Sequence, residues 1–261
     1  MRNRSLGITL ALVIILSCSA AASSQDKDPS KPAKTTDSGE THDLTGVWMQ
    51  DHPPATADQY WIYKFTVEEL PMTAWGQAQY KAAKSSFGPH PYPLAKTNDP
   101  VYHGCYPPGF PRIFLHPFPM QIVQATGEVI MLFEYDSMRH QIFTDGREHD
   151  TSLGPTWMGN SIGHWEGDTL VADTLNFNDK TWIDRMGHPH SDALHIVERI
   201  RRIDHEHLVD DITIEDPKAY TKTWTVHLSF LLRPSWTLGE QFCEEEESFQ
   251  DLEKKETSPG K

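Results

Sequence analysis

From residue 120 onward, hydrophobic and polar residues alternate with a period of two. Runs such as EVIMLFEYD, DTLVADTLNF and WTVHLSFLLRP have the pattern of half-buried strands, and turn signals at residues 126–127, 145–146 and 166–168 separate several of them. Nine such runs, together with LTGVWMQ near residue 46, predict about ten strands. We therefore expect an all-β antiparallel meander that folds as a sandwich or closes into a barrel, because closure removes exposed strand edges.

One short helix is expected before these strands. The segment TVEELPMTAWGQAQYKAAKSS contains many good helix formers, and Thr66 followed by Glu69 is a capping-box pattern. Pro71 restricts where a helix can begin, so we place the helix at about residues 72–85.

A proline-rich segment follows this helix. Residues 88–119 contain nine prolines, which exclude a long helix and the interior of a hydrogen-bonded ladder. The segment is predicted to be a long ordered loop, or a plug, that covers a pocket of the β-structure.

The N-terminus has the pattern of an export signal. Positive residues precede an apolar run of about eleven residues, which is too short to span a membrane, and small residues follow. Cys18 in ILSC fits a lipoprotein signal, whereas the alanines before Ser23 fit ordinary signal peptidase. We expect an exported bacterial protein, either periplasmic or anchored to the outer membrane by a lipid on Cys18, with any membrane contact made through that lipid.

Changes in composition along the chain predict the domain boundaries. A signal is expected over residues 1–22, a disordered polar tether over 23–43, a single β-barrel domain over 44–246 and a disordered acidic and polar tail over 247–261.

Two cysteines remain after Cys18, namely Cys105 and Cys243. In an oxidising compartment they can pair and tie the start of the folded body to its end, and the alternative is two free buried thiols. We favour the disulfide. The formal net charge of −14 argues against a nucleic-acid partner, because binding a phosphate backbone needs a basic face.

Two resemblances bear on the fold. LTGVW resembles the Gly-x-Trp opening of lipocalins, where the tryptophan packs across the closed end of a barrel, and this implies a lipocalin-like barrel. A second resemblance covers residues 105–243 and is carried by CYPPGFPR, FTDGREH, HSDALHIVERIRR and above all GNSIGHWEGDTLVADT. These stretches are similar to a large family of exported bacterial proteins with no assigned activity, which implies export and an all-β body but no catalytic residue or substrate.

The alternation of residues along the strands predicts which side chains face a pocket. In TWMGNSIGHWEGDTL, Trp157, Ser161 and Trp165 share a face with two glycines and are candidate substrate-binding residues. Glycine within a strand marks either a barrel corner or a close approach by a backbone or ligand, and both interpretations stay open.

Two glutamates are predicted to face an apolar interior. Glu198 alternates with aliphatic residues in LHIVERIRRID, and Glu134 repeats the arrangement in the earlier hairpin. A buried carboxylate must be paired, hydrogen-bonded or protonated. Glu198 is therefore either a catalytic acid or base, or one half of a structural ion pair with an arginine; the nearby arginines are Arg139, Arg147 and Arg199.

The stretch DRMGHPHSDALHIVER is rich in histidines and acids. If the loop that precedes the strand lies over the barrel mouth, Asp184, His188 and His190 would face a second set of polar residues in the RHQIFTDGREH hairpin, namely His140, Asp145 and Arg147. A histidine held by a carboxylate transfers protons near pH 7, and an arginine holds an anionic oxygen.

A divalent metal is the minority alternative for the same stretch. His188 and His190 on an extended segment point the same way, and His195 could complete a ligand set. The spacing does not fit the cupin pattern, because the window that should hold a glutamate contains Ala193 and Leu194. We predict no cofactor.

Several catalytic motifs are absent from the sequence. It has no glycine-rich phosphate loop, no Gly-x-Ser-x-Gly elbow, no His-Glu-x-x-His helix and no Cys-x-x-Cys. We therefore expect a pocket that binds a small organic molecule and catalyses cofactor-free proton transfer of isomerase, lyase or hydratase type. The alternatives are a non-catalytic binding lipoprotein and a metal-dependent enzyme.

Overall fold

A computed structural model of the chain describes residues 42–51, 63–66 and 68–243. The predicted signal, Cys18, most of the tether and the C-terminal tail lie outside this part. The elements are β1 (Gly46–Gln50), α1 (Ala74–Ala82), the 3₁₀ helix η1 (Leu94–Lys96), α2 (Pro100–Gly104), the 3₁₀ helix η2 (Arg112–Leu115), β2 (Met120–Ala125), β3 (Glu128–Phe133), β4 (Arg139–Phe143), β5 (Asn160–Glu166), β6 (Thr169–Leu175), β7 (His195–Arg202), β8 (His207–Glu215) and β9 (Trp224–Leu232).

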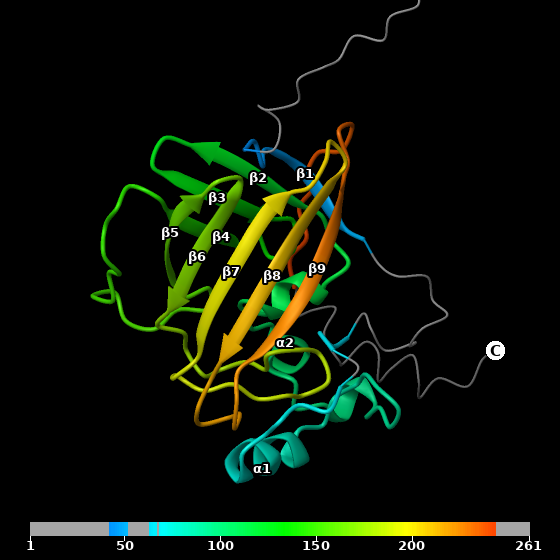
Figure 1. Ribbon diagram of the computed structural model, residues 1–261. Helices are drawn as coiled ribbons and strands as arrows, with labels where there is room; N and C mark the ends of the chain where they lie inside the picture. The colour runs from blue at the N-terminus through cyan, green and yellow to red at the C-terminus, as the bar shows by residue number, and fades with distance from the viewer. Residues whose placement is uncertain (1–41, 52–62, 67, 244–261) are drawn as a thin grey trace, which may run out of the picture. The chain divides into compact units, whose positions relative to one another are not determined.

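The nine strands form one closed barrel in chain order (Figure 1). Closure is made by β1, which pairs with β9 in the register Trp48↔Leu232 and with β2 in the register Val47↔Gln121. The expectation of an all-β barrel is thus confirmed, with nine strands instead of ten. The last strand-like run, GEQFCEE, is not one of the nine strands; in its described part, Gln241 makes an isolated bridge with Tyr135.

One strand pair breaks the antiparallel meander. β4 and β5 run parallel and pair through Ile142↔Ser161 and Phe143↔Ile162. The connection between them, residues 144–159, is far longer than a hairpin turn, so the chain returns to the same end of the barrel before β5 begins. The pairing leaves the β4 residues before Ile142 without a β5 partner.

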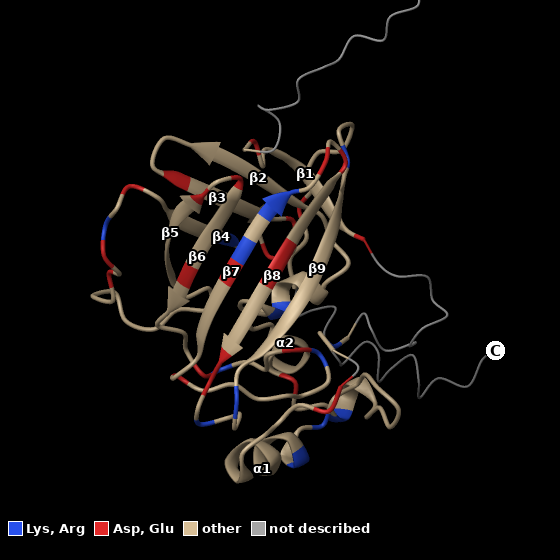
Figure 2. Cartoon of the chain, viewed as in Figure 1, with Lys and Arg blue, Asp and Glu red and all other residues tan. Residues whose placement is uncertain are grey.

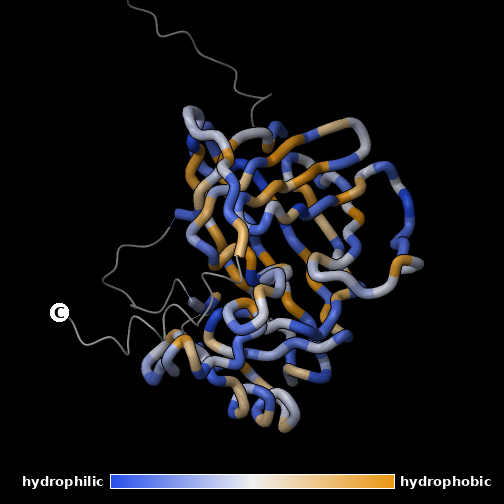
Figure 3. The backbone as a smooth tube through the Cα atoms, turned by 180° about the vertical axis from the view of Figure 1, so that it is seen from behind, coloured by the Kyte–Doolittle hydropathy of each residue, from blue (hydrophilic) through white to orange (hydrophobic). Residues whose placement is uncertain are grey.

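The period-two pattern sorts each strand into an inner and an outer face. In β8, for example, Leu208, Asp210, Ile212 and Ile214 are buried and alternate with more exposed residues. Figure 3 shows the same alternation as hydrophobic and hydrophilic segments that follow one another along the barrel strands. The buried faces form one core inside the barrel.

The proline-rich segment fills this core rather than covering a pocket. Within η2, Ile113, Phe114 and Leu115 are buried, and the Phe114 ring lies 5.5 Å from Phe133 of β3 and 5.4 Å from Phe230 of β9. The segment therefore acts as a plug that packs against the inner faces of strands from different sides of the barrel. Of the two predicted alternatives, a loop and a plug, the structure has the plug, because its apolar side chains are buried against the inner faces of the strands.

α1 is shorter than predicted and is capped at a different residue. It begins after Thr73, whose hydroxyl accepts a hydrogen bond from the Gly76 N–H, so the cap lies after Pro71 and not at Thr66. A second short helix, α2, was not predicted. Asp99 caps it by accepting a hydrogen bond from the Val101 N–H.

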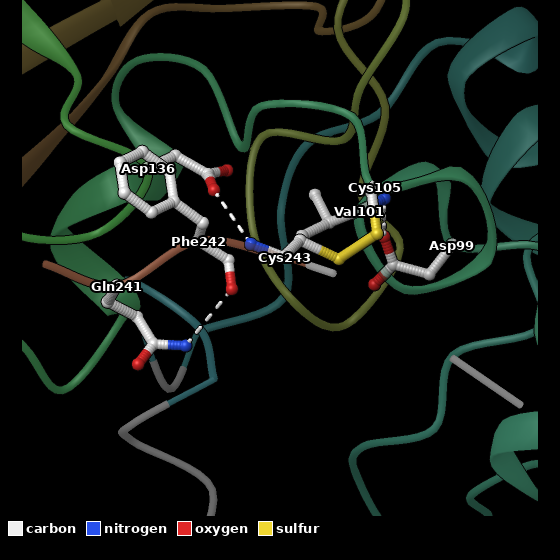
Figure 4. The surroundings of a disulfide bond; sticks show 7 residues. All are labelled: Asp99, Val101, Cys105, Asp136, Gln241, Phe242 and Cys243. Carbon is white, nitrogen blue, oxygen red and sulfur yellow. Dashed lines mark hydrogen bonds between the residues drawn. A yellow bond between two sulfur atoms is a disulfide. The ribbon is translucent and has the colours of Figure 1, made fainter. Parts of the chain in front are cut away.

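The predicted disulfide between Cys105 and Cys243 is confirmed (Figure 4). The two Cα atoms are 5.5 Å apart, although 138 positions separate the residues in the chain. Asp136 supports the C-terminal side of the bond by accepting a hydrogen bond from the Cys243 N–H. The end of the described chain is thereby held against the proline-rich segment and the β3–β4 turn.

Among the helices of the described residues, none has the length and apolar character needed to cross a membrane.

Candidate functional site

His140 and Glu198, which the sequence analysis predicted separately as candidate catalytic residues, contact each other inside the barrel. His140 of β4 and Glu198 of β7 are both buried, and His140 Nε2 lies 2.7 Å from Glu198 Oε2. The Phe110 ring stacks on the imidazole at 4.3 Å, so the plug holds one face of the histidine. Glu198 shares its buried face with Ile196 and Ile200, as the alternation predicted, and its partner is a histidine instead of an arginine.

Asp210 of β8 extends this pair to three groups. The register Ile200↔Asp210 makes Asp210 a diagonal neighbour of Glu198 on the inner face of the sheet. Burial, and next the charge of Glu198, raise the pKa of Asp210 well above its usual value. Asp210 Oδ1, Asp210 Oδ2 and Glu198 Oε1 are buried and have no hydrogen-bond partner among the described residues. Figure 2 shows acidic and basic residues on the adjacent strands β7 and β8.

A cavity of about 530 Å³ lies where β4 and β5 separate. Its lining includes the β4 residues that have no β5 partner and the segment that leads into β5. Four of the predicted site residues line it, namely His140, Arg147, Trp157 and Ser161. Asp145 forms an exposed ion pair with Arg147, with 2.6 Å between the charged atoms. The Arg147 guanidinium also lies over the Phe143 ring at 3.8 Å.

Gly163 of β5 lies next to this wall. An added Cβ at Gly163 would lie 2.7 Å from Ile142 Cγ2 and 2.9 Å from the Val171 carbonyl oxygen. Glycine here permits close packing of β5 on its neighbours, which is the barrel-corner interpretation and not a ligand contact.

A second histidine–carboxylate pair lies in the loop before β7. His188 Nδ1 lies 2.6 Å from Asp184 Oδ2, and the Asp184 carboxylate is buried. Asp184 Oδ1 accepts hydrogen bonds from the backbone N–H groups of Met186 and His188. The loop conformation thus fixes the carboxylate, and the carboxylate in turn orients the imidazole.

This pair borders a cavity of about 550 Å³ beside α1. His188 lines the cavity, and its ring is stacked on Tyr80 of α1 with 4.3 Å between the centroids and 5° between the planes. Burial and the Asp184 charge raise the pKa of the Tyr80 hydroxyl, so it remains a donor at neutral pH. Polar residues from the segment before α1 complete the wall; they are Lys64, Thr66, Glu68 and Glu69.

The two predicted sets of residues therefore border different cavities. His140 and Arg147 line the cavity between β4 and β5, whereas His188 lines the cavity beside α1.

The other predicted residues have separate partners. His190 is buried, with Nε2 3.2 Å from the Thr181 hydroxyl, and burial lowers the pKa of its imidazole. Trp165 lies against His42, 5.5 Å between ring centroids. Glu134 follows β3 on the face opposite to Met131 and Phe133, and accepts a hydrogen bond from the Gly239 N–H, so it does not face the interior as expected.

The minority metal site is not assembled by the histidines proposed for it. His188 binds Asp184, His190 binds Thr181, and His195 Nε2 lies 2.8 Å from Asp173. Within residues 42–51, 63–66 and 68–243, no group of three or more histidine, cysteine or acidic side chains is arranged to hold a metal ion.

Sequence reasoning missed three residues of these sites. Asp210 carries the same signal as Glu198, a single acid that alternates with aliphatic residues in HLVDDITIED, and could have been found from it. Phe110 and Tyr80 carry no comparable signal, because each reaches its histidine from an element distant in the chain.

Comparison of the chain with protein-family models, curated proteins and solved structures gives no match.

Proposed function

We propose that the protein is an exported enzyme that binds a small organic molecule in the cavity beside α1 and transfers a proton through His188 without a cofactor. The observation that carries this proposal is the 2.6 Å contact between His188 Nδ1 and the buried Asp184 carboxylate at the wall of that cavity. This pair supports the proposal better than His140 does, because His140 is buried under Phe110.

The contact with Asp184 selects one tautomer of His188. A carboxylate only accepts hydrogen bonds, so Nδ1 carries the proton and Nε2 is left with a lone pair. The hydrogen bonds among the described residues leave Nε2 without a partner. Nε2 is thus the atom that accepts a proton from a bound molecule, and the imidazolium formed is stabilised by Asp184. Asp184 is a positioning residue in this scheme.

The reaction classes follow from the fate of that proton. Return of the proton from His188 to a different atom of the same molecule is an isomerisation. Delivery to a departing oxygen is a lyase reaction. In its reverse, a hydration, His188 takes a proton from the water that adds to the double bond and returns it to the neighbouring carbon. Each reaction needs only the imidazole, the substrate and, for hydration, a water molecule, so the proton balance closes on Nε2.

The lining of the cavity supports a small molecule with aromatic or carbonyl character. Leu70, Met72 and Met186 provide apolar surface, while Gln77 and the Tyr80 hydroxyl provide hydrogen-bonding groups. Cavities that combine apolar walls with a few polar groups are typical of small-molecule sites.

Export is the second part of the proposal. The disulfide between Cys105 and Cys243 supports it, because disulfides persist in oxidising compartments. The proposed compartment is the periplasm or the periplasmic face of the outer membrane, with a lipid on Cys18 as the anchor. A lipocalin-like barrel is supported by the buried Trp48, whose indole N–H donates to the Leu44 carbonyl while Arg202 packs over its ring.

Solvent deuterium exchange tests the chemistry on many candidate substrates at once. The protein is incubated in D₂O with a mixture of small aromatic and carbonyl compounds, and mass spectrometry detects deuterium in any of them. We expect incorporation with the natural protein and a loss of about 10²–10⁴-fold with His188→Gln. Asp184→Asn should also reduce the rate and change its pH profile, because an amide does not select the Nε2 lone pair.

His164→Gln is the matched control, because His164 is an exposed histidine that also contacts a carboxylate, at 3.2 Å from Glu166. Full exchange by the His188→Gln protein would contradict the proposal. If a compound binds tightly but acquires no deuterium, and His188→Ala combined with His190→Ala changes only its affinity, the protein is the non-catalytic carrier instead.

A further inference from the structure

A cluster of buried arginine and histidine side chains lies at the plug, and its Arg185 directly follows Asp184 in the chain. We define the buried arginine cluster as Arg112, His116 and Arg185, all of which are buried, together with Asp99. Arg112 and His116 come from η2 and its C-terminal cap, and Arg185 comes from the loop before β7. Arg185 reaches the plug by donating a hydrogen bond from Nη1 to the Leu115 carbonyl oxygen.

The cluster has more hydrogen-bond donors than acceptors. Arg112 Nη2 donates to Asp99 Oδ2 at 2.6 Å, and Arg185 Nη2 donates to the Tyr102 hydroxyl at 2.8 Å. Four buried nitrogen atoms have no hydrogen-bond partner in the described part of the chain; they are Arg112 Nε, Arg112 Nη1, Arg185 Nε and His116 Nε2. Asp99 does not satisfy them, because its other oxygen accepts the Val101 N–H as the helix cap.

The charges of the cluster do not balance. Arg112 and Arg185 are cations at any pH of interest, and among the described residues Asp99 supplies the one negative charge in direct contact, an ion pair with Arg112. Burial, and then the two guanidinium groups, hold the pKa of His116 well below its usual value, so the histidine remains neutral and adds no charge. The cluster therefore carries a net charge of about +1, and a buried charge of this kind is costly without a counterion.

Aromatic rings surround the cluster and keep its dielectric low. Phe87 lies 4.1 Å from the Arg185 guanidinium, Tyr135 lies 4.2 Å from the His116 ring, and Trp182 lies 5.7 Å from the Arg112 guanidinium. Burial also raises the pKa values of Tyr102 and Tyr135, so their hydroxyl groups stay protonated and neutral. None of these rings supplies the missing negative charge.

We propose that the buried arginine cluster binds one small monovalent anion of the chloride type, held between Arg112, Arg185 and His116. A spherical anion accepts N–H donors from several directions at once, which suits unpartnered nitrogens that come from two separate segments. One negative charge also neutralises the cluster. The anion would tie the plug to the loop that carries Asp184 and His188, and so stabilise both.

Bromide is the probe, because it replaces chloride and its anomalous scattering identifies it in a crystal. Crystals of the natural protein grown with sodium bromide should show an anomalous peak within hydrogen-bonding distance of Arg112 and Arg185. In solution, unfolding should depend on the anion: at a bromide concentration one hundred times its Kd, the unfolding constant falls about 100-fold relative to sodium gluconate of equal ionic strength.

Variants separate this site from a general salt effect. Arg185→Met should abolish the difference between bromide and gluconate, and His116→Phe should weaken it while both positive charges remain. Arg147→Met is the matched control, because Arg147 is an exposed arginine that pairs with Asp145, and it should keep the full difference. If Arg185→Met does not fold, the His116→Phe variant and the bromide crystals still test whether the cluster binds an anion.

Two outcomes would overturn the proposal. The first is a bromide-soaked crystal in which the cluster shows no anomalous peak and the four nitrogens contact water or aromatic faces only. The second is equal stability of the natural protein in bromide and gluconate.

Discussion

His140 and Glu198 lie on strands β4 and β7, yet His140 Nε2 lies 2.7 Å from Glu198 Oε2 inside the barrel. Both side chains are buried, and Phe110 of the plug stacks on the imidazole. The pair joins strands that are not neighbours in the sheet, so it couples the two sides of the barrel and the plug in one contact.

Removal of Glu198 from the His140–Glu198 pair should destabilise the folded protein. We expect Glu198→Ala to reduce the free energy of unfolding by about 3–5 kcal/mol, because it leaves the His140 imidazole buried without its partner. Urea unfolding measures the loss. Glu166→Ala is the matched control, since Glu166 is an exposed glutamate that pairs with Arg199, and its solvent-screened contact should contribute far less. Equal losses in the two variants would show that the buried pair is not a stabilising contact.

Asp210 should make stability depend on pH in a direction opposite to that of most acids. Its pKa is raised above 3.8 in the folded protein, mainly by burial and next by Glu198, so the folded state holds a proton that the unfolded state releases. The contribution of Asp210 is fully present below pH 3.8 and is lost as the pH rises through the folded pKa, with a slope of at most about 1.4 kcal/mol per pH unit.

The variant Asp210→Asn isolates this contribution. The stability of the variant relative to the natural protein should increase steadily as the pH is raised above 3.8, which unfolding curves at a series of pH values measure. Asp173→Asn is the control with the opposite sign. Burial disfavours the charge of Asp173, but hydrogen bonds from His195 and His149 outweigh it and lower the pKa, so its contribution is lost as the pH falls. A constant offset for Asp210→Asn across the pH range would refute the assignment of a raised pKa.

The disulfide closes a loop whose ends are 138 positions apart. In the chain-entropy model, its removal through Cys105→Ser with Cys243→Ser should cost about 2–5 kcal/mol, mostly by freeing the unfolded chain. Denaturant unfolding of this double variant, with Cys18→Ser as the cysteine control, measures the effect. A loss confined to the Cys18 variant would be inconsistent with a bond between Cys105 and Cys243.

The separate partners of His188, His190 and His195 predict that these histidines hold no metal together. Elemental analysis of the untagged protein purified from the periplasm should therefore give the same zinc, iron and manganese content for the natural protein and for His188→Ala with His190→Ala. One equivalent of metal that disappears in the double variant would make these residues a ligand set and restore the metal-dependent alternative.

Much of the barrel could be predicted because its strands carry a local signal. Alternation in runs such as EVIMLFEYD assigns buried and exposed faces residue by residue, and it placed Glu198 inside correctly. The same rule failed for Glu134, because the buried face of β3 is made by Val129, Met131 and Phe133, whereas Glu134 shares the opposite, less buried face with Ile130 and Leu132. The pairing of Cys105 with Cys243 could be predicted without geometry, because only two cysteines remain after Cys18 and the expected compartment is oxidising.

The candidate sites were less predictable, since they depend on contacts across long distances in the chain. The stretch DRMGHPHS indicated acid–base residues, and the pair Asp184–His188 is local, four positions apart. Its cavity is not local, because α1 supplies Tyr80 from more than one hundred positions earlier. This loop and the residue 139–149 hairpin were expected to share one pocket, but they border different cavities. The proline-rich segment has no periodicity from which its position in the core could be predicted.

The sequence by itself determined the all-β class and the buried face of strands such as β7, and it places Asp184 and His188 four positions apart, because each of these features rests on periodicity or on residues close together in the chain. Only the tertiary structure decided that β4 and β5 run parallel, that His140 meets Glu198, and that Arg112 and Arg185 share one buried cluster. These relationships arise when a closed barrel forces distant inner faces together around a single plug, and the energy of a buried charge depends on that final arrangement and not on its neighbours in the chain.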